Sequence, residues 1–252
     1  MTTPRDDDDA LAAELAAAAG RILLATRETG LFTGKALGRA GDAIAQQLLA
    51  NALLTHRPDD AVLSEEAGDD AARLSALRVW IIDPLDGTRE YGEGRHDWAV
   101  HVALAVDGVP GPSAVALPGL DKVLSTAAVA PLPDVGDRAP RIAVSRSRAP
   151  EVADRVAEAL GAELVPMGSA GYKTMAVATG EVDAYLHAGG QYEWDSAAPV
   201  GVAWAHGLHA SRIDGSALIY NQADPLLPDL LVCRPELAEP ILAALAAEGA
   251  KA

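Results

Sequence analysis

Two aspartates separated by two residues follow a short apolar run, and they are the first sign of chemistry in this sequence. The run Val79–Ile82 leads into Asp83-Pro84-Leu85-Asp86-Gly87-Thr88. Pro84 restricts φ and stiffens the tight turn expected there, and Gly87 permits a close approach of the backbone to an anion. If a helical turn begins at Thr88, its free N–H groups form a seat for a phosphate group. Carboxylates beside such a seat need cations between them and the phosphate, and hard oxygen ligands suit Mg²⁺.

An isolated pair of this kind is more often an ordinary turn with capping side chains. Two further acidic motifs argue against that interpretation. Ser64-Glu65-Glu66 ends the preceding apolar run, and Trp194-Asp195-Ser196-Ala197-Ala198 places an aspartate at the start of a helix far downstream. By itself, Asp195 would be interpreted as the N-cap of that helix. Together the motifs predict a carboxylate cluster that binds metal, built from Glu65, Asp83, Asp86 and Asp195.

The three motifs, in this order, resemble those of the inositol monophosphatase superfamily of lithium-sensitive, Mg²⁺-dependent phosphatases. The surrounding elements fit from about Leu11 to Val232. The resemblance implies an α/β (α+β) fold, a layered α-β-α-β-α sandwich of the inositol monophosphatase and fructose-1,6-bisphosphatase type, with the site between two subdomains. It also implies a homodimer, and inhibition by Li⁺.

The resemblance further implies two Mg²⁺ ions and a weaker third ion near Glu65. The first ion would be held by Glu65, Asp83 and the backbone carbonyl of Leu85, and the second by Asp83, Asp86 and Asp195. Asp83 would bridge the two ions. Bound cations make the attacking water more acidic and neutralise the phosphate oxygens, so no protein nucleophile is needed.

A threonine and an aspartate match the pair that helps to activate this water in the family. They are Thr88 and Asp42, and with Glu65 they form the candidate catalytic set. The sequence leaves a second interpretation of Asp42 open, in which it is a plain N-cap of the second helix.

The residues around these motifs favour one substrate class. Arg89-Glu90-Tyr91, after Gly87-Thr88, resembles the branch that hydrolyses 3′-phosphoadenosine 5′-phosphate. Val144-Ser145-Arg146-Ser147 and Gly168-Ser169-Ala170-Gly171-Tyr172-Lys173 resemble the bacterial 3′(2′),5′-bisphosphate nucleotidases, and His187 stands near the place of a glutamate that receives sugar hydroxyls in inositol phosphatases. The candidate substrate-binding residues are Gly87, Thr88, Arg89, Ser145, Arg146, Gly168, Ser169, Lys173 and His187.

For three of these residues, an interpretation without a functional role remains open. Arg146 is equally well interpreted as lying on a solvated turn, and Lys173 on an exposed helix face, because basic side chains are mostly exposed. His187 either contacts a nucleotide or is a buried histidine with its own hydrogen bonds.

The function expected is hydrolysis of 3′-phosphoadenosine 5′-phosphate to AMP and phosphate within sulfate assimilation, with 3′-phosphoadenylyl sulfate as a second candidate substrate. The nearest alternative is a broad phosphatase acting on inositol 1-phosphate or fructose 1,6-bisphosphate. An alternative of another class is a catalytically silent protein that binds metal and nucleotide.

Composition excludes some classes of partner. The formal net charge of −16 over 252 residues argues against binding of nucleic-acid polymers, which needs a basic surface. The single cysteine, Cys233, allows no intramolecular disulfide and is expected in a late buried strand. No apolar run approaches 18 residues, and the start of the chain is acidic where a secretory signal would be basic. We therefore expect a cytoplasmic protein without membrane contact, whose Asp6–Asp9 run is a solvated tail ending in a helix N-terminus.

Periodicity places these motifs on elements. It predicts helices over 10–27, after Asp42, and over 150–160, 169–179 and 195–206. It predicts strands over 61–64, 79–82, 98–106, 115–117, 123–126, 141–144, 164–166 and 184–187, with a hairpin at Asp107-Gly108. The stretch 130–140, with three prolines, is the expected linker, which gives an N-terminal subdomain of residues 1–135 with most metal ligands and a C-terminal subdomain of residues 136–252.

Overall fold

Two long helices open the chain because leucine and alanine recur along one face of each. The computed structural model describes residues 7–147 and 149–249, and in it α1 spans Asp8–Glu28 and α2 spans Gly34–His56. Asp7 caps α1 by accepting a hydrogen bond from the Asp9 N–H at 3.0 Å. The prediction for the acidic run is therefore confirmed over Asp7–Asp9, while Asp6 lies outside the described residues.

The first sheet carries the Asp83 motif. Its strands are β1 (Ala61–Ser64), β2 (Arg78–Asp86), β3 (Ala99–Val106), β4 (Val109–Leu117) and β5 (Lys122–Ser125), hydrogen-bonded in that order. Only the β1–β2 pair is parallel. The predicted hairpin joins β3 and β4, where Asp107 and Gly108 both have positive φ, as a two-residue turn of this kind requires. Short helical turns follow β1, β2 and β4: η2 (Ala71–Ser75), α3 (Thr88–Gly92) and η3 (Pro118–Leu120).

The second sheet follows the stretch 126–140, which contains no helix or strand. Its strands are β6 (Arg141–Ser145), β7 (Glu163–Met167), β8 (Ala184–Tyr192), β9 (His209–Ser211) and β10 (Leu226–Cys233), in the order β7-β6-β8-β10-β9. The strand pairs that β6 forms are parallel and those of β10 are antiparallel. The helices of this half are α4 (Glu151–Leu160), α5 (Ala170–Ala178), α6 (Glu193–Ala205) and α7 (Pro235–Gly249).

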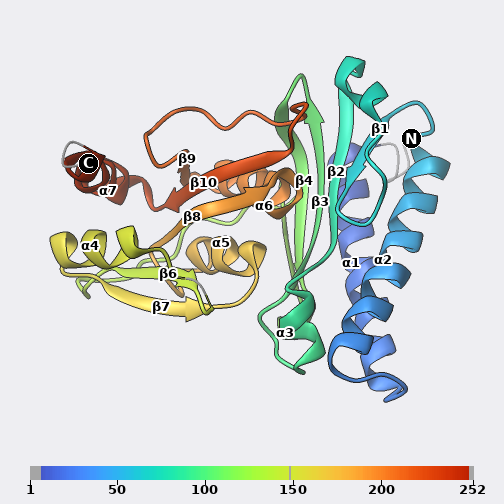
Figure 1. Ribbon diagram of the computed structural model, residues 1–252, viewed down its shortest axis with the longest axis horizontal. Coiled ribbons are helices and arrows are strands. Elements are labelled where there is room, and N and C mark those ends of the chain that lie inside the picture. The colour runs from blue at the N-terminus through green and yellow to red at the C-terminus, as the bar shows by residue number, and fades with distance from the viewer. Residues whose placement is uncertain (1–6, 148, 250–252) are drawn as a thin grey trace.

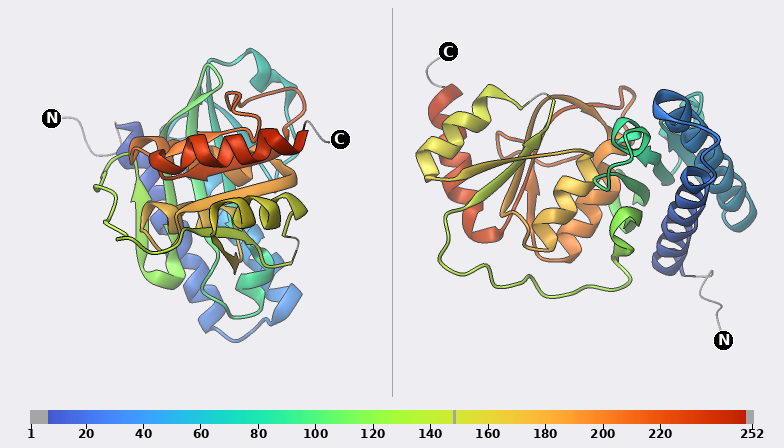
Figure 2. Two further views of the ribbon diagram at one scale, coloured as in Figure 1. Left: turned by 90° about the vertical axis from the view of Figure 1, so that its left-hand side faces the viewer. Right: turned by 90° about the horizontal axis from the view of Figure 1, so that it is seen from below.

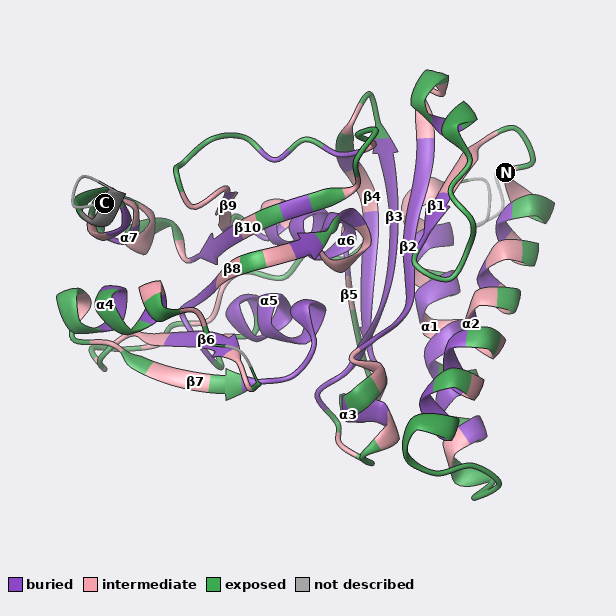
Figure 3. Cartoon of the chain, viewed as in Figure 1, coloured by how far each residue is buried: buried purple, intermediate pink, exposed green. Residues whose placement is uncertain are grey.

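The elements stack in five layers, which confirms the predicted α-β-α-β-α sandwich. Helices α1 and α2 cover the outer face of the first sheet, α5 and α6 lie between the two sheets, and α4 and α7 cover the second sheet (Figures 1 and 2). Three separate apolar clusters fill the spaces between these layers. Figure 3 shows that β2, β3 and β4 are buried along most of their length, so a polar side chain that points inward from them needs partners in the adjacent layer.

Three local predictions were wrong in ways that matter for the site. The predicted tight turn at Asp83–Asp86 is instead the end of β2, interrupted by a bulge between these two residues. Helix α2 begins at Gly34, well before Asp42, so Asp42 lies inside the helix and is not its N-cap. Helix α6 begins at Glu193, which makes Asp195 its third residue, not the N-cap.

The error in α2 has a physical cause. Gly34 and Gly38 lower the helix propensity of the first part of α2, yet a Cβ on Gly38 would lie 2.6 Å from Thr88 Cγ2. The close packing of α2 against α3 therefore decides the helix boundary there, and propensity does not. The late elements β9 and α7 were not predicted; α7 carries Pro240 in its interior, which hides the helical pattern.

The subdomain boundary at residues 135/136 stays a proposal. Among residues 7–147 and 149–249, no helix combines the length and the hydropathy that a membrane span requires.

Candidate active site

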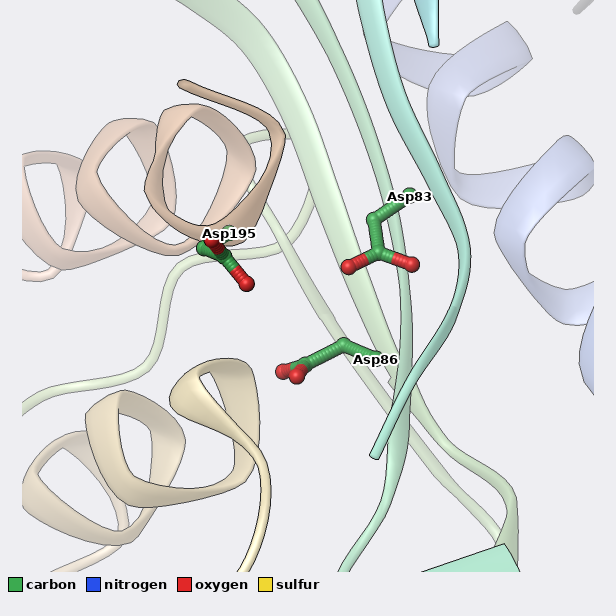
Figure 4. A group of neighbouring side chains, drawn as sticks. All are labelled: Asp83, Asp86 and Asp195. Atoms are coloured by element: carbon green, nitrogen blue, oxygen red, sulfur yellow. The ribbon is translucent and has the colours of Figure 1, made fainter. Parts of the chain in front are cut away.

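Three carboxylates from the two halves of the chain converge between the first sheet and the middle helices. One oxygen each of Asp83, Asp86 and Asp195 lies within 4.8 Å of the others. Asp83 and Asp86 come from the end of β2, and Asp195 from the first turn of α6, so the three side chains approach one another from two sides (Figure 4). The β-bulge between the two β2 aspartates disturbs strand alternation. Both can therefore point toward the helices.

Asp86 is the most heavily hydrogen-bonded of the three. Its Oδ2 atom accepts hydrogen bonds from the Ser169 hydroxyl and from the Gly171 N–H at 2.7 Å, at the start of α5. His101 Nε2 lies 3.2 Å from the same oxygen. These neighbours hold the carboxylate through Oδ2. Oδ1 is the atom that can face a cation.

The other two carboxylates are each held by a backbone N–H group. Asp83 Oδ1 accepts from the Leu85 N–H at 3.0 Å, and Asp195 Oδ2 accepts from the Tyr192 N–H at 2.7 Å. The second bond ties the Asp195 side chain to the backbone of the N-cap residue of α6. Because each carboxylate is fixed through one oxygen, all three can present the other oxygen to a shared ion.

The electrostatics of the cluster favour a cation. Burial, followed by the charges of Glu65 and Asp86, raises the pKa of Asp83 well above its usual range. Burial and then the charge of Asp86 raise the pKa of Asp195 to about 6. For Asp86 burial is again the largest influence and acts in the same direction, but the neighbouring His101, the Ser169 hydroxyl and the charge of Lys173 together outweigh it and lower the pKa to about 2. Raised pKa values show that the negative charge of these crowded carboxylates is not compensated by the protein. A hard divalent cation bound by their oxygens would compensate it.

Glu65 and Leu85, the remaining predicted ligands, lie at the edge of this group. Glu65 follows β1 and is outside the compact set of three. Glu65 is exposed as a residue. Partial desolvation of its carboxyl group, followed by the charges of Asp195 and Asp86, raises its pKa to about 7, so this group interacts electrostatically with the cluster. The Leu85 carbonyl accepts a hydrogen bond from the Thr88 hydroxyl at 3.1 Å.

The Thr88–Asp42 pair is present. Thr88 is the first residue of α3, after Gly87 with φ 89°, and its hydroxyl lies 3.4 Å from Asp42 Oδ1. Burial and the charge of Glu66 raise the pKa of Asp42 to about 7, although the hydrogen bond from Thr88 acts against this. A carboxylate that titrates near neutrality beside a hydroxyl group is suited to accept a proton.

The turn Gly168–Ser169 joins the site to the second sheet. Ser169 adopts φ 47°, which is uncommon for a residue with a side chain, and its hydroxyl also accepts from the Tyr172 N–H. The Gly168 N–H donates to Asp97 Oδ2 at 2.8 Å. The alternative of an exposed Lys173 was wrong, since Lys173 is buried and its ammonium group donates to the Gly168 and Ser169 carbonyls.

The predicted arginines are engaged with acidic side chains. Arg146 donates to Glu90 Oε1 at 2.6 Å and to Glu93 Oε2 at 3.0 Å, and the exposed Arg89 pairs with Glu93 at 2.9 Å. Arg146 therefore lies on a partly exposed bend with its charge paired, and the choice between its two interpretations stays open.

Two predicted residues lie on strands of the second sheet. Ser145 ends β6, and His187 on β8 forms a hydrogen bond between Nε2 and the Gly190 carbonyl at 3.0 Å. His187 is only partly buried, so the choice between its two interpretations stays open.

Two residues at the cluster were missed as contributors. His101 lies in β3 directly opposite Asp83, and Gly171 is the second residue of α5. The one available signal was a single histidine in an otherwise apolar strand, which by itself indicates nothing about a site.

Comparisons with known proteins agree with this geometry. The model of the family described as "Inositol monophosphatase family" matches residues 6–250. A protein of Mycobacterium leprae named 3′-phosphoadenosine 5′-phosphate phosphatase is 53% identical, covering 93% of this chain and 92% of its own. The 3′(2′),5′-bisphosphate nucleotidase CysQ of Escherichia coli is 31% identical over 75% of this chain and 81% of its own. The crystal structure of a staphylococcal IMPase-II superposes with a TM-score of 0.77 at 23% identity, covering 94% and 93% of the two chains.

We expect the metal-free protein to lose stability between pH 5.5 and 7.5. Folding raises the pKa of Asp42 and Glu65 to about 7 and that of Asp195 to about 6. The folded state therefore holds more protons than the unfolded chain in this range, and the stability these groups contribute at low pH disappears as they ionise. In chelator, the Tm should fall by ~4 °C or more, roughly 2 kcal/mol for a chain of this size.

The variant Asp83→Asn serves as the internal comparison, because it removes one buried negative charge. At pH 7.5 without metal it should melt above the wild type and show a smaller pH dependence, while Asp59→Asn, at an exposed position, should behave as wild type. Millimolar divalent cation should raise the wild-type Tm more at pH 7.5 than at pH 5.5. Equal pH dependence in the wild type and Asp83→Asn would contradict this account of the cluster.

Proposed function

The chain belongs to the inositol monophosphatase family, and from that premise we propose that it hydrolyses 3′-phosphoadenosine 5′-phosphate to AMP and phosphate. One observation carries the reaction class: three carboxylates within 4.8 Å, two buried and one half-buried, each held through one oxygen so that the other can face a cation. The nucleotide substrate is supported by the relatives, since a chain 53% identical over nearly its whole length bears the name of that phosphatase. Such an activity would serve sulfate assimilation, and 3′-phosphoadenylyl sulfate is a second candidate substrate.

We propose Mg²⁺ as the cation, with two ions and a weaker third one near Glu65. Asp83, Asp86 and Asp195 would hold one ion, and Glu65, Asp83 and the Leu85 carbonyl another. When bound, such ions make a water molecule more acidic and neutralise charge on the phosphate group. The cluster fits this cofactor because every proposed ligand is a hard oxygen atom.

The chain's own residues would complete the reaction. The Thr88 hydroxyl lies 3.4 Å from Asp42 Oδ1. It would orient the attacking water and relay the proton that this water releases to the Asp42 carboxylate. Ser169 would lie beside the substrate at the start of α5, where the Gly171 and Tyr172 N–H groups are used to hold Asp86 and the Ser169 hydroxyl in place. Gly87, Arg89, Ser145, Arg146, Gly168, Lys173 and His187 remain candidate substrate-binding residues.

The ion pairs of Arg89 and Arg146 bear on how the substrate would bind. A phosphate group reaching either guanidinium must compete with Glu93, and for Arg146 also with Glu90. Any contribution of these residues to affinity is therefore smaller than that of an unpaired arginine. A homodimer is likewise proposed, on the family resemblance alone, and a cytoplasmic location is proposed on the composition of the chain.

Phosphate release with Mg²⁺ tests the substrate. We expect kcat/KM for 3′-phosphoadenosine 5′-phosphate to exceed those for inositol 1-phosphate and fructose 1,6-bisphosphate by ~100-fold, about 2.7 kcal/mol of transition-state discrimination. Comparable values would make the protein a phosphatase of broad specificity. Nucleotide binding with Mg²⁺ but without phosphate release would identify a catalytically silent member.

Thr88→Ala should lower kcat by ~100-fold or more, because the attacking water loses the hydroxyl that links it to Asp42. Binding of Mg²⁺ should be unchanged, since no proposed metal ligand is altered. Thr88→Ser keeps the hydroxyl and should retain most of the activity. If Thr88→Ala and Thr88→Ser have the same kcat, the hydroxyl has no role in proton transfer.

Li⁺ at millimolar concentration should inhibit turnover supported by Mg²⁺. A monovalent ion that enters the carboxylate cluster supplies half the charge, so it leaves the phosphate oxygens less neutralised. Initial rates at a fixed Mg²⁺ concentration, with K⁺ as the control salt, measure the effect. Rates that are the same in the two salts would remove lithium sensitivity from the proposal.

A further inference from the structure

A fully buried histidine that no predicted role uses lies behind the carboxylate cluster. His101 is 0% exposed and stands opposite Asp83 in the β2–β3 pairing, so the two side chains share one face of the first sheet. Its Nδ1 atom lies 2.9 Å from the Trp194 carbonyl, in the first turn of α6. A carbonyl oxygen only accepts, so Nδ1 carries a proton and donates it. Nε2 faces a carboxylate oxygen, which also only accepts, so it carries the second proton of an imidazolium.

The other ring nitrogen points at a proposed metal ligand. His101 Nε2 lies 3.2 Å from Asp86 Oδ2, yet it is buried without a hydrogen bond of good geometry. A buried polar atom in this state costs free energy, so its position calls for an explanation. The imidazole lies between two proposed metal ligands that come from different layers. One is Asp86 on β2, and the other is Asp195 on α6, the residue after Trp194.

Helix α5 holds the imidazole in this place. A Cβ atom on Gly171 would lie 1.9 Å from His101 Nε2, closer than any two such atoms can approach. The Gly171 N–H also donates to Asp86 Oδ2. Glycine is therefore required at this position for α5 and the imidazole to contact the same carboxylate oxygen.

We propose that His101 is a positioning residue of the metal site, which sets the spacing between Asp86 and Asp195 by joining the Asp86 carboxylate to the backbone of α6. The inference rests on the proposed function only in taking these aspartates as metal ligands. In known metal sites, loss of a residue that orients a ligand weakens metal binding or activity by ~10–100-fold. A histidine that merely fills the core would leave both unchanged.

Titration calorimetry of the substrate-free protein with Mg²⁺ alone, or with Mn²⁺ where heats are small, tests this role. We expect His101→Leu to weaken binding by ~10-fold or more, and to lower kcat/KM for the substrate. His101→Gln keeps an N–H donor and should recover part of the affinity. The control is His206→Leu, which removes another buried histidine that bonds a carbonyl of α6, at the far end of that helix. It should leave the affinity within twofold of wild type.

A second set of variants tests the contact between Gly171 and His101, because a larger residue at position 171 displaces the imidazole without removing it. Gly171→Ala should weaken Mg²⁺ binding as strongly as His101→Leu, because the new methyl group displaces the imidazole from Asp86. In a His101→Ser background, which leaves room for the methyl group, Gly171→Ala should add little. Gly111→Ala, whose Cβ would meet only the Leu104 carbonyl at 3.8 Å, is the matched control and should bind as wild type.

The outcomes separate this inference from the proposed function. If the folded His101→Leu protein binds Mg²⁺ within twofold of wild type, His101 is a core residue and the inference is wrong. If the effects of Gly171→Ala and His101→Ser on affinity are simply additive, the contact between them does not carry the effect. Neither result depends on which phosphomonoester is hydrolysed, because the titrations contain no substrate. An absence of Mg²⁺ and Mn²⁺ binding by the wild type would instead overturn the metal site itself.

Discussion

Mutual repulsion among buried carboxylates is the constraint on which the rest of this structure depends. Three aspartates with oxygens within 4.8 Å of one another would each be more stable in water, and burial raises the pKa of two of them. Asp86 is the exception, because its Oδ2 atom accepts hydrogen bonds from the Ser169 hydroxyl and the Gly171 N–H and lies 3.2 Å from the His101 ring. The cluster is therefore asymmetric: one carboxylate is kept ionised by the protein, and the other two depend on a cation for the same state.

The layered fold explains how such a cluster can form. The β-bulge in β2 turns Asp83 and Asp86 toward the middle layer, and the first turns of α5 and α6 arrive there from the second half of the chain. Helix α5 contributes backbone N–H groups, and α6 contributes the side chain of Asp195. The macrodipole of each helix favours negative charge at its N-terminus. The site is assembled from the end of strand β2 and the N-termini of two helices, so it places its ligands on rigid elements. Among the proposed ligands, only Glu65 lies on a loop. The apolar clusters on both sides of the middle layer hold these elements together.

Much of this arrangement could be predicted from the sequence, and the failures have physical causes. The acidic motifs were predictable because each stands directly after an apolar run or at a helix start, and such signals are local. The layer order followed from the resemblance that these motifs carry. The end of β2 was mistaken for a turn because Pro84 usually ends a strand, while a bulge can accommodate it. Lys173 was not recognised as buried, because its two carbonyl partners come from the turn before α5, whose geometry depends on Asp97 and Asp86. The role of His101 was out of reach, since its neighbours lie on β2, α5 and α6, and nothing in the adjacent sequence indicates that they meet.

Glycine in the two helices that contact the site shows how stability and chemistry are balanced there. Gly38 lies inside α2 and Gly171 inside α5, where alanine would raise helix propensity by ~1 kcal/mol each. At both positions a methyl group would collide with a residue of the site, Thr88 Cγ2 at 2.6 Å or His101 Nε2 at 1.9 Å. The chain is rich in alanine elsewhere in α1 and α2, so glycine here does not reflect composition. Helix stability is lower at these two points because the helix backbone must come close to a residue beside the site, α2 to Thr88 on α3 and α5 to His101 on β3.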